Sequence, residues 1–245
     1  MRAALRCCCA APLLLVAGAV WALDPHKAIT QLAHRSWRDE LPQNTIHTIL
    51  QTRDGYLWFG TYEGLVRFDG VRFVVFDAAR SKHLRGTSVL HLAEDQHGRL
   101  WIATNGGLAV REEGRFRTYT TDDGLPSDVV GAVLPRPDGT LLVGTDKGIC
   151  CFSGERCQPA GLDGPTPGAV KALVADGPDV VWVASDRGLL RVEGRVVTRL
   201  TVDDGLPSNL CRAVLPDRNR TLWVCLLYTS PSPRDRTRSR LPSSA

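Results

Sequence analysis

The stretch LWFGTYEGLVRFDG, residues 57–70, opens on an aromatic pair, closes on a glycine turn and recurs along the chain. Its counterparts are LWIATNGGLAVREEG from Leu100, LLVGTDKGICCFSG from Leu141, VWVASDRGLLRVEG from Val181 and a fifth that begins LWV at Leu222. The register positions Trp58, Trp101, Leu142, Trp182 and Trp223 are 43, 41, 40 and 41 residues apart. A period near 40 residues is typical of a stacked or radial array, in which one repeat cannot bury its apolar faces alone.

Within each repeat the pattern is that of four short antiparallel strands. TIHTILQ from Thr45 alternates apolar and polar residues, and the turn signals RDG, YEG and DG separate it from YLWFGT, LVRF and VRFVVF. The frequent glycine turns and the β-branched content exclude helical repeats of similar period. We therefore predict an all-β fold, an incomplete β-propeller of four-stranded antiparallel blades with four blades and the start of a fifth.

The repeats also predict the domain boundaries. We expect a propeller region over residues 23–224, with blades at about 43–77, 85–120, 127–161 and 167–201, a partial blade at 208–224 and a ring-closing strand at about 28–37. DELP at Asp39 and DDGLPS at Asp122 and Asp203 mark the links between blades, where the proline fixes the exit angle.

Three repeated positions have predictable roles. The register tryptophans supply large apolar area where neighbouring blades press together. Two residues later stand small residues, as expected where another blade approaches closely: Gly60, Ala103, Gly144 and Ala184. The next residue offers a hydroxyl that can bond to the backbone of the following turn: Thr61, Thr104, Thr145 and Ser185.

The two ends of the chain differ from the repeats. Residues 1–22 combine two arginines with the apolar run PLLLVAGAVWA and small residues at a cleavage spacing, which predicts a signal peptide and export. The run is short for a membrane-spanning helix. Residues 225–245 lack strand alternation and are rich in Ser, Pro and Arg, which predicts a disordered tail. This tail also resembles translated adapter or vector sequence, so we interpret it as an artefact of sequencing or assembly.

Charge and cysteine content limit the function classes. The formal charge of +4 is concentrated in those two ends, which leaves the repeats at about −1 and argues against nucleic-acid binding. Five cysteines follow the signal peptide without metal-ligand spacing, and a bridge from Cys157 to Cys150 or Cys151 is as compatible with the sequence as free thiols are. We expect no metal, no cofactor and no catalytic residue, because the six histidines form no recurring or paired pattern and hydrolase, zinc-protease and nucleotide-binding motifs do not occur.

QTRDGYLWFGTYEGLVRFDG together with DDGLPS resembles the two-component regulator propeller repeat. This repeat occurs in the exported sensor region of bacterial hybrid histidine kinases and diguanylate cyclases. The resemblance covers about residues 28–224, and it implies a periplasmic propeller that senses a ligand and signals through a membrane helix to a cytoplasmic output domain. It further implies that the missing blades, the membrane segment and the output domain lie downstream of this fragment, and that the full-length protein can form a homodimer.

Repetition separates candidate site residues from scaffold, because positions that differ between blades are free to carry specificity. The differing residues fall in the turn after the second strand, on the same face as the crossover links. We predict that they converge on the mouth of the channel and bind a small polar ligand such as a carbohydrate: Tyr62, Glu63, Asn105, Asp146, Lys147, Asp186 and Arg187. The competing interpretation is that these residues are polar because turns are solvated, and it weighs more heavily for the link aspartates, since Asp before Gly is ordinary turn chemistry.

Two other function classes remain open at this point. Propellers also host lyases and dehydrogenases, whose sites gather His, Arg or Trp at the same central mouth. A secreted scaffold that binds protein partners would instead expose apolar residues on the flat faces of the ring.

Overall fold

The computed structural model describes residues 36–37, 41–77, 84–154, 156–217, 219 and 221–227. The predicted signal peptide and residues 228–245 of the predicted tail lie outside the described residues. The predicted start of the tail at residue 225 is wrong, because Cys225 and Leu226 belong to the last strand, Leu222–Leu226. Of the expected ring-closing strand only residues 36 and 37 are described, and they form no strand.

The described chain folds into antiparallel sheets, four of them four-stranded and one two-stranded. The first contains β1 (Ile46–Gln51), β2 (Leu57–Thr61), β3 (Gly64–Phe68) and β4 (Phe73–Phe76); the second contains β5 (Val89–Glu94), β6 (Leu100–Thr104), β7 (Gly107–Glu112) and β8 (Arg115–Tyr119). The third contains β9 (Val130–Pro135), β10 (Leu141–Thr145), β11 (Gly148–Ser153) and β12 (Arg156–Pro159); the fourth contains β13 (Val170–Asp176), β14 (Val180–Ser185), β15 (Gly188–Glu193) and β16 (Val196–Leu200). The last contains β17 (Cys211–Pro216) and β18 (Leu222–Leu226). Two 3-10 turns, Thr121–Asp123 and Val202–Asp204, precede the third and the last sheet, and no helix in the described part is long and apolar enough to span a membrane.

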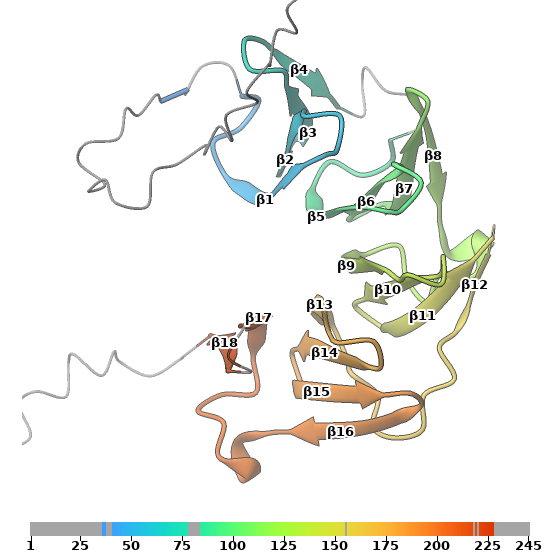
Figure 1. Cartoon of the computed structure of the whole chain (residues 1–245), viewed down its shortest axis with the longest axis vertical. Helices are drawn as coiled ribbons and strands as arrows, with labels where there is room; N and C mark the ends of the chain where they lie inside the picture. Colours follow the sequence, from blue (N-terminus) through green and yellow to red (C-terminus); the bar gives the residue numbers. More distant parts are fainter. Residues whose placement is uncertain are drawn as a thin grey trace, which may run out of the picture. The chain divides into compact units, whose positions relative to one another are not determined.

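The sheets follow one another radially. In every four-stranded sheet the strands pair in chain order, so each sheet is a simple meander. The first strand of each sheet contacts the first strand of the next, and Figure 1 shows β1, β5, β9, β13 and β17 facing a common centre. This is the blade arrangement of a β-propeller, and the predicted fold class is confirmed.

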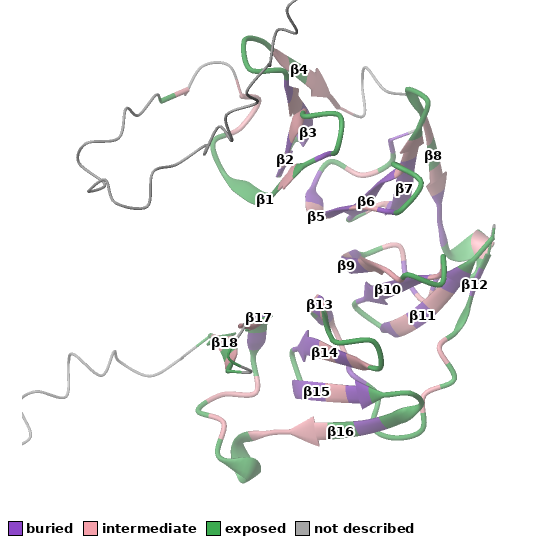
Figure 2. Ribbon diagram, in the orientation of Figure 1, coloured by how far each residue is buried: buried purple, intermediate pink, exposed green. Residues whose placement is uncertain are grey.

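The hydrophobic core lies between blades (Figure 2). Trp58 and Leu65 of the first blade pack with Leu92 and Ile102 of the second in one buried cluster. Equivalent clusters join the second blade to the third, the third to the fourth, and the fourth to β17 and β18. A four-stranded sheet therefore buries its two faces only against its neighbours, as the repeat pattern predicts.

The register tryptophans are held in two ways. Trp58 and Trp101 are almost fully buried between blades, whereas Trp182 is half-buried and Trp223, on β18, is 63% exposed. The predicted packing role is therefore confirmed for Trp58 and Trp101, and also for Trp182, which packs against the cluster that joins the fourth blade to β17 and β18. It is wrong for Trp223, because no further blade packs on β18 among the described residues. Each indole N–H also donates a hydrogen bond to the residue six positions earlier, with donor–acceptor distances of 2.8–3.2 Å: Thr52, Asp95, Asp176 and Asp217.

The predicted hydroxyl position has the same geometry in all four blades. Thr61 Oγ1 accepts from the backbone N–H of Glu63 and donates to the carbonyl of Gly64, and Thr104, Thr145 and Ser185 repeat this pair of bonds. All four side chains are completely buried. The hydroxyl thus satisfies two backbone groups that the turn between the second and third strands leaves unpaired, which confirms the prediction.

A single disulfide closes the hairpin of β11 and β12. It joins Cys150 to Cys157, whose Cα atoms are 5.9 Å apart, while Cys151 is free. Of the alternatives compatible with the sequence, the structure therefore selects this bridge.

The small residues after the register positions lie where the next blade approaches. A Cβ added at Gly60 would lie 2.7 Å from Val89 Cγ1, and one added at Gly144 would overlap Val170 Cγ1. Val89 and Val170 begin the first strand of the following blade. The predicted close approach is confirmed, and it sets the spacing of the inner strands around the centre.

We expect Gly144→Ala to lower the free energy of unfolding by about 1–3 kcal/mol, because the added methyl group overpacks the contact with Val170. Val170→Ala also destabilises the fold, since it leaves a cavity. In the double variant the overlap with Val170 Cγ1 is gone, while the contact with the retained Cβ of residue 170, at 2.8 Å, remains tight. We therefore expect the double variant to lose about 1 kcal/mol less than the sum of the two single losses. Urea unfolding of the four proteins measures the cycle, and strictly additive losses would contradict the close approach.

Candidate functional site

Every inner strand begins with a one-residue β-bulge. In the first blade Ile46 pairs with Thr61 and Thr48 pairs with Gly60, so His47 is the extra residue. The same shift in pairing occurs at the start of β5, β9, β13 and β17 and leaves one extra residue in each: Leu90, Gly131, Lys171 and Arg212. A bulge redirects a side chain that regular pairing would place on a face of the sheet.

All five bulge residues line one cavity of about 270 Å³. The turn residues Tyr62 and Asp146 and the link or strand residues Val129 and Val170 complete its lining. Since each bulge residue comes from a different blade and the inner strands face a common centre (Figure 1), this cavity lies at the mouth of the channel that the blades line. It combines a small apolar surface with several ionisable groups, as ligand pockets commonly do.

The charged groups of the cavity are predominantly cationic. Lys171 and Arg212 supply two positive charges, and Asp146 supplies one negative charge. Among the residues that the structure describes, neither Lys171 nor Arg212 forms an ion pair. The opposite part of the wall is aromatic, because the rings of His47 and Tyr62 are in edge-on contact with centroids 4.1 Å apart.

The first variable residue of the turn between the second and third strands has one of two roles, depending on the blade. Tyr62 and Asp146 line the cavity. The side chain of Asn105 instead accepts a hydrogen bond of 3.0 Å from the backbone N–H of Ser88, and the side chain of Asp186 accepts one of 2.9 Å from that of Ala169. These two side chains fasten their turns to the link that enters the same blade, 17 residues earlier.

The second variable residue of the same turn does not line the channel cavity in any blade where it was predicted to do so. Glu63, Lys147 and Arg187 are exposed, and their backbone N–H groups bond to the buried hydroxyls described above. Lys147 borders a different, mostly apolar pocket beside the link between the third and fourth blades. Of the seven predicted site residues, the structure therefore brings Tyr62 and Asp146 together at the channel mouth.

The bulge residues are the part of the site that the sequence analysis missed. A signal was present, since His47, Leu90, Gly131, Lys171 and Arg212 each stand 11 residues before the register position of their repeat. This position varies in charge and size from blade to blade while the residue before it stays apolar. Variation at one register position on the first strand would have identified it.

The link aspartates have structural roles, as the turn interpretation predicted. Asp123 Oδ2 accepts from the backbone N–H of Thr120 at 2.9 Å, and Asp204 repeats this bond with Thr201. Gly124 and Gly205 then end the two 3-10 turns with φ of 94° and 99°, a conformation that favours glycine. These carboxylates are committed to capping their own turns.

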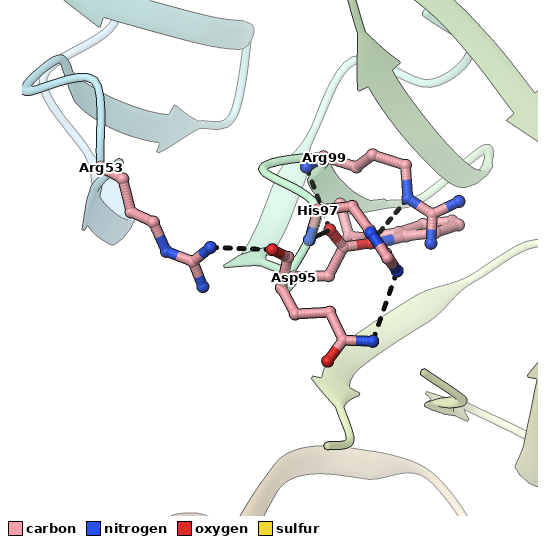
Figure 3. A network of polar contacts seen from close by, with 6 residues as sticks. Arg53, Asp95, His97 and Arg99 are labelled. Carbon is pink, nitrogen blue, oxygen red and sulfur yellow. Dashed lines mark hydrogen bonds and ion pairs between the residues drawn. The ribbon is translucent and has the colours of Figure 1, made fainter. Parts of the chain in front are cut away.

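A second polar cluster lies at the other end of the strands, around Asp95 (Figure 3). Asp95 accepts hydrogen bonds from the Trp101 indole, the Arg99 guanidinium and the backbone N–H groups of His97 and Arg99, all between 2.7 and 3.0 Å. Arg53 extends from the first blade to the carbonyl of Gln96. Burial raises the pKa of Asp95, but the bonds from Trp101, Arg99 and His97 outweigh it, so this pKa lies below its ordinary value. The carboxylate is saturated by its own blade, and we interpret the cluster as structural.

No group of three or more metal-ligating side chains occurs within the described residues. The acidic and histidine side chains of the channel mouth, Asp146 and His47, come from different blades. The arrangement at this mouth is suited to holding a ligand between a cationic and an aromatic wall.

Comparison with protein families matches two segments of the chain. The family model described as "Two component regulator propeller" matches residues 40–63 and 83–106, which include the first two register positions. No curated protein sequence matches the chain significantly.

Solved structures share the fold. The extracellular domain of BT3049 from B. thetaiotaomicron, described as a hybrid two-component system, superposes with a TM-score of 0.63 at 17% identity, over 75% of this chain and 26% of that one. The extracellular domain of BT4673 from the same organism gives a TM-score of 0.62 at 22% identity, over 74% and 28%. An inactive virginiamycin B lyase from Staphylococcus aureus gives 0.60 at 12% identity, over 73% and 62%. The chain thus spans about a quarter of the length of these two extracellular domains.

We expect Asn105→Ala to lower the free energy of unfolding by about 1 kcal/mol, because it removes the bond that fastens the turn to Ser88. Asp146→Ala, at the equivalent position of the next blade, is the matched control and should change it by less than about 0.5 kcal/mol. Chemical unfolding of both variants tests the division of the turn residues into fastening and cavity-lining side chains. Equal losses would contradict it.

We expect Asp95→Ala to cost about 2–4 kcal/mol, because it leaves the buried Trp101 indole N–H without an acceptor. Asp176→Ala removes the same bond from the half-buried Trp182, where water can replace it, so its cost should be smaller.

The cost of Asp95→Ala should also depend on pH. The pKa of Asp95 is lowered on folding, so its stabilisation is complete above the unfolded-state pKa of about 3.9 and is lost as the pH falls through the lower folded-state pKa. The gap between wild type and variant should therefore narrow below pH 4 in thermal unfolding. A gap that is constant or wider in acid would contradict the role given to this carboxylate.

Proposed function

The chain carries two-component regulator propeller repeats, and on that premise we propose that it is the ligand-binding input region of a bacterial signal-transduction protein. The ligand is small and polar, of the size of a monosaccharide, and it binds at the channel mouth. The region itself performs no chemistry.

One observation carries this proposal. The five bulges place one residue from each blade at a single cavity, and these residues (four side chains and a glycine) differ while the packing positions around them repeat. A position that only stabilised the blade would be filled in the same way in each repeat. The variation is what a binding site built on a symmetric scaffold requires.

Binding without catalysis is supported by the way the cavity is built. No side chain that lines it is hydrogen-bonded to another lining side chain among the described residues, whereas an activated nucleophile needs a base within such reach. The likeness to virginiamycin B lyase, at 12% identity, is a likeness of the fold alone.

An exported location is part of the proposal. The Cys150–Cys157 bridge supports it, because disulfides persist in oxidising compartments, and so does the predicted signal peptide. We place the region in the periplasm. A membrane segment and a histidine kinase or diguanylate cyclase output domain would belong to the longer protein of which this chain covers a part.

We expect Tyr62→Ala to weaken ligand binding by about tenfold or more, since it removes a half-exposed aromatic ring that lines the cavity. Glu63→Ala, in the same turn but outside the cavity, should leave affinity unchanged. A panel of neutral and acidic mono- and disaccharides, first screened by thermal shift and then titrated by calorimetry, provides the measurement. Failure of every sugar to bind saturably, or binding insensitive to Tyr62→Ala, would refute the proposal.

A further inference from the structure

We propose that the channel cavity recognises a sugar acid, whose carboxylate is held by Lys171 and Arg212 and whose ring lies against Tyr62. This inference rests on the proposed function and specifies the chemistry of its ligand. It is carried by the placement of charge among the bulge residues.

The two cations stand side by side on the scaffold. Lys171 is the bulge residue of β13 and Arg212 that of β17, so both occupy the same register position in successive blades. The strands β13 and β17 contact one another, and both side chains line the cavity. An ammonium and a guanidinium presented from adjacent strands form a fork that a carboxylate can bridge.

The charge of this fork is not neutralised by the protein. Asp146 is the only acidic side chain among the described residues that line the cavity. Asp186, in the turn nearest to Lys171 in its own blade, has a carboxylate oxygen engaged by the backbone N–H of Ala169. The cavity therefore keeps a net positive charge inside a repeat region whose overall formal charge is about −1. An anionic ligand would supply the missing partner.

The rest of the wall selects for more than charge. Tyr62 is in T-shaped contact with His47 and is still 50% exposed, so about half of its surface is available for contact with a ligand. Leu90, Val129 and Val170 add apolar surface. A sugar ring presents both C–H faces and hydroxyl groups, and this combination suits a wall that is aromatic on one side and polar on the other.

The third blade adds no side chain to the lining at its bulge, because Gly131 occupies the bulge position of β9, where other blades carry large side chains. Glycine is required there by the approach of the fourth blade, since an added Cβ would overlap the carbonyl of Val170. The cavity volume of about 270 Å³ is slightly below the usual range of about 300–1,000 Å³ for ligand pockets, which favours a monosaccharide.

The test compares matched probes on the full chain. Calorimetric titration uses glucuronate, its neutral counterpart glucose, and acetate as a carboxylate without a ring. We expect glucuronate to bind at least tenfold more tightly than glucose or acetate. Lys171→Gln and Arg212→Gln should each weaken glucuronate binding by about tenfold or more and leave the weak binding of glucose unchanged.

Matched variants control for nonspecific charge effects. Lys147→Gln and Arg187→Gln remove the same charges from exposed turns outside the cavity, so they should leave glucuronate affinity within about twofold of wild type. Asp146→Asn should strengthen glucuronate binding, because it removes the one like charge in the cavity. Thermal unfolding of each variant verifies that the fold is retained.

The outcomes distinguish this inference from the proposed function. Glucose bound as tightly as glucuronate, with affinity lost in Tyr62→Ala but retained in Lys171→Gln and Arg212→Gln, would overturn the sugar-acid inference and support the sensor function. Acetate bound as tightly as glucuronate would overturn the role of the ring. Binding of none of the three probes would overturn the inference, while the wider saccharide panel decides the proposed function separately.

Discussion

The structure depends on one constraint: a blade has no core of its own. Each sheet buries its faces only against the sheets before and after it, in clusters that join Trp58 to Ile102 and Trp101 to Phe152. The consequence is a repeating geometry in which the distance between inner strands is set by small residues such as Gly60 and Gly144. That spacing defines the central cavity, because it fixes how closely the first strands of successive blades approach their common centre.

Within a repeat, some polar residues stabilise the blade and others are available for binding. The hydroxyl at Thr61 and its equivalents satisfies turn backbone, and the residue six positions before each tryptophan accepts its indole N–H. These recurring polar groups are therefore satisfied within their own blade. The bulge residue is different, since the bulge removes it from regular pairing and the cavity leaves its side chain uncommitted. Except at Gly131, where the neighbouring blade requires glycine, the residue at this position can therefore differ from blade to blade without altering the packing positions.

The two polar clusters of the molecule accordingly have different roles, one structural and one in binding. Around Asp95 the carboxylate oxygens are already bonded to Arg99 and Trp101 of the same blade, so they have no capacity left for a ligand. At the channel mouth, Lys171 and Arg212 have no anionic partner among the described residues. Unpartnered charged groups in a concave surface indicate a binding site, because their electrostatic energy becomes more favourable when a ligand of opposite charge neutralises them.

The sequence by itself determined the blades, their strands and their packing positions, because the alternation of apolar residues and the glycine turns are local patterns that recur with a period near 40 residues. It also identified the turn that carries Tyr62 and Asp146. It did not reveal that Asn105 and Asp186 bond to links 17 residues earlier, since that depends on how each link approaches its turn. Only the tertiary structure decided the binding surface, for a physical reason. A bulge exists only once two strands have paired in a particular register, and residues 40 positions apart meet only when the blades pack radially.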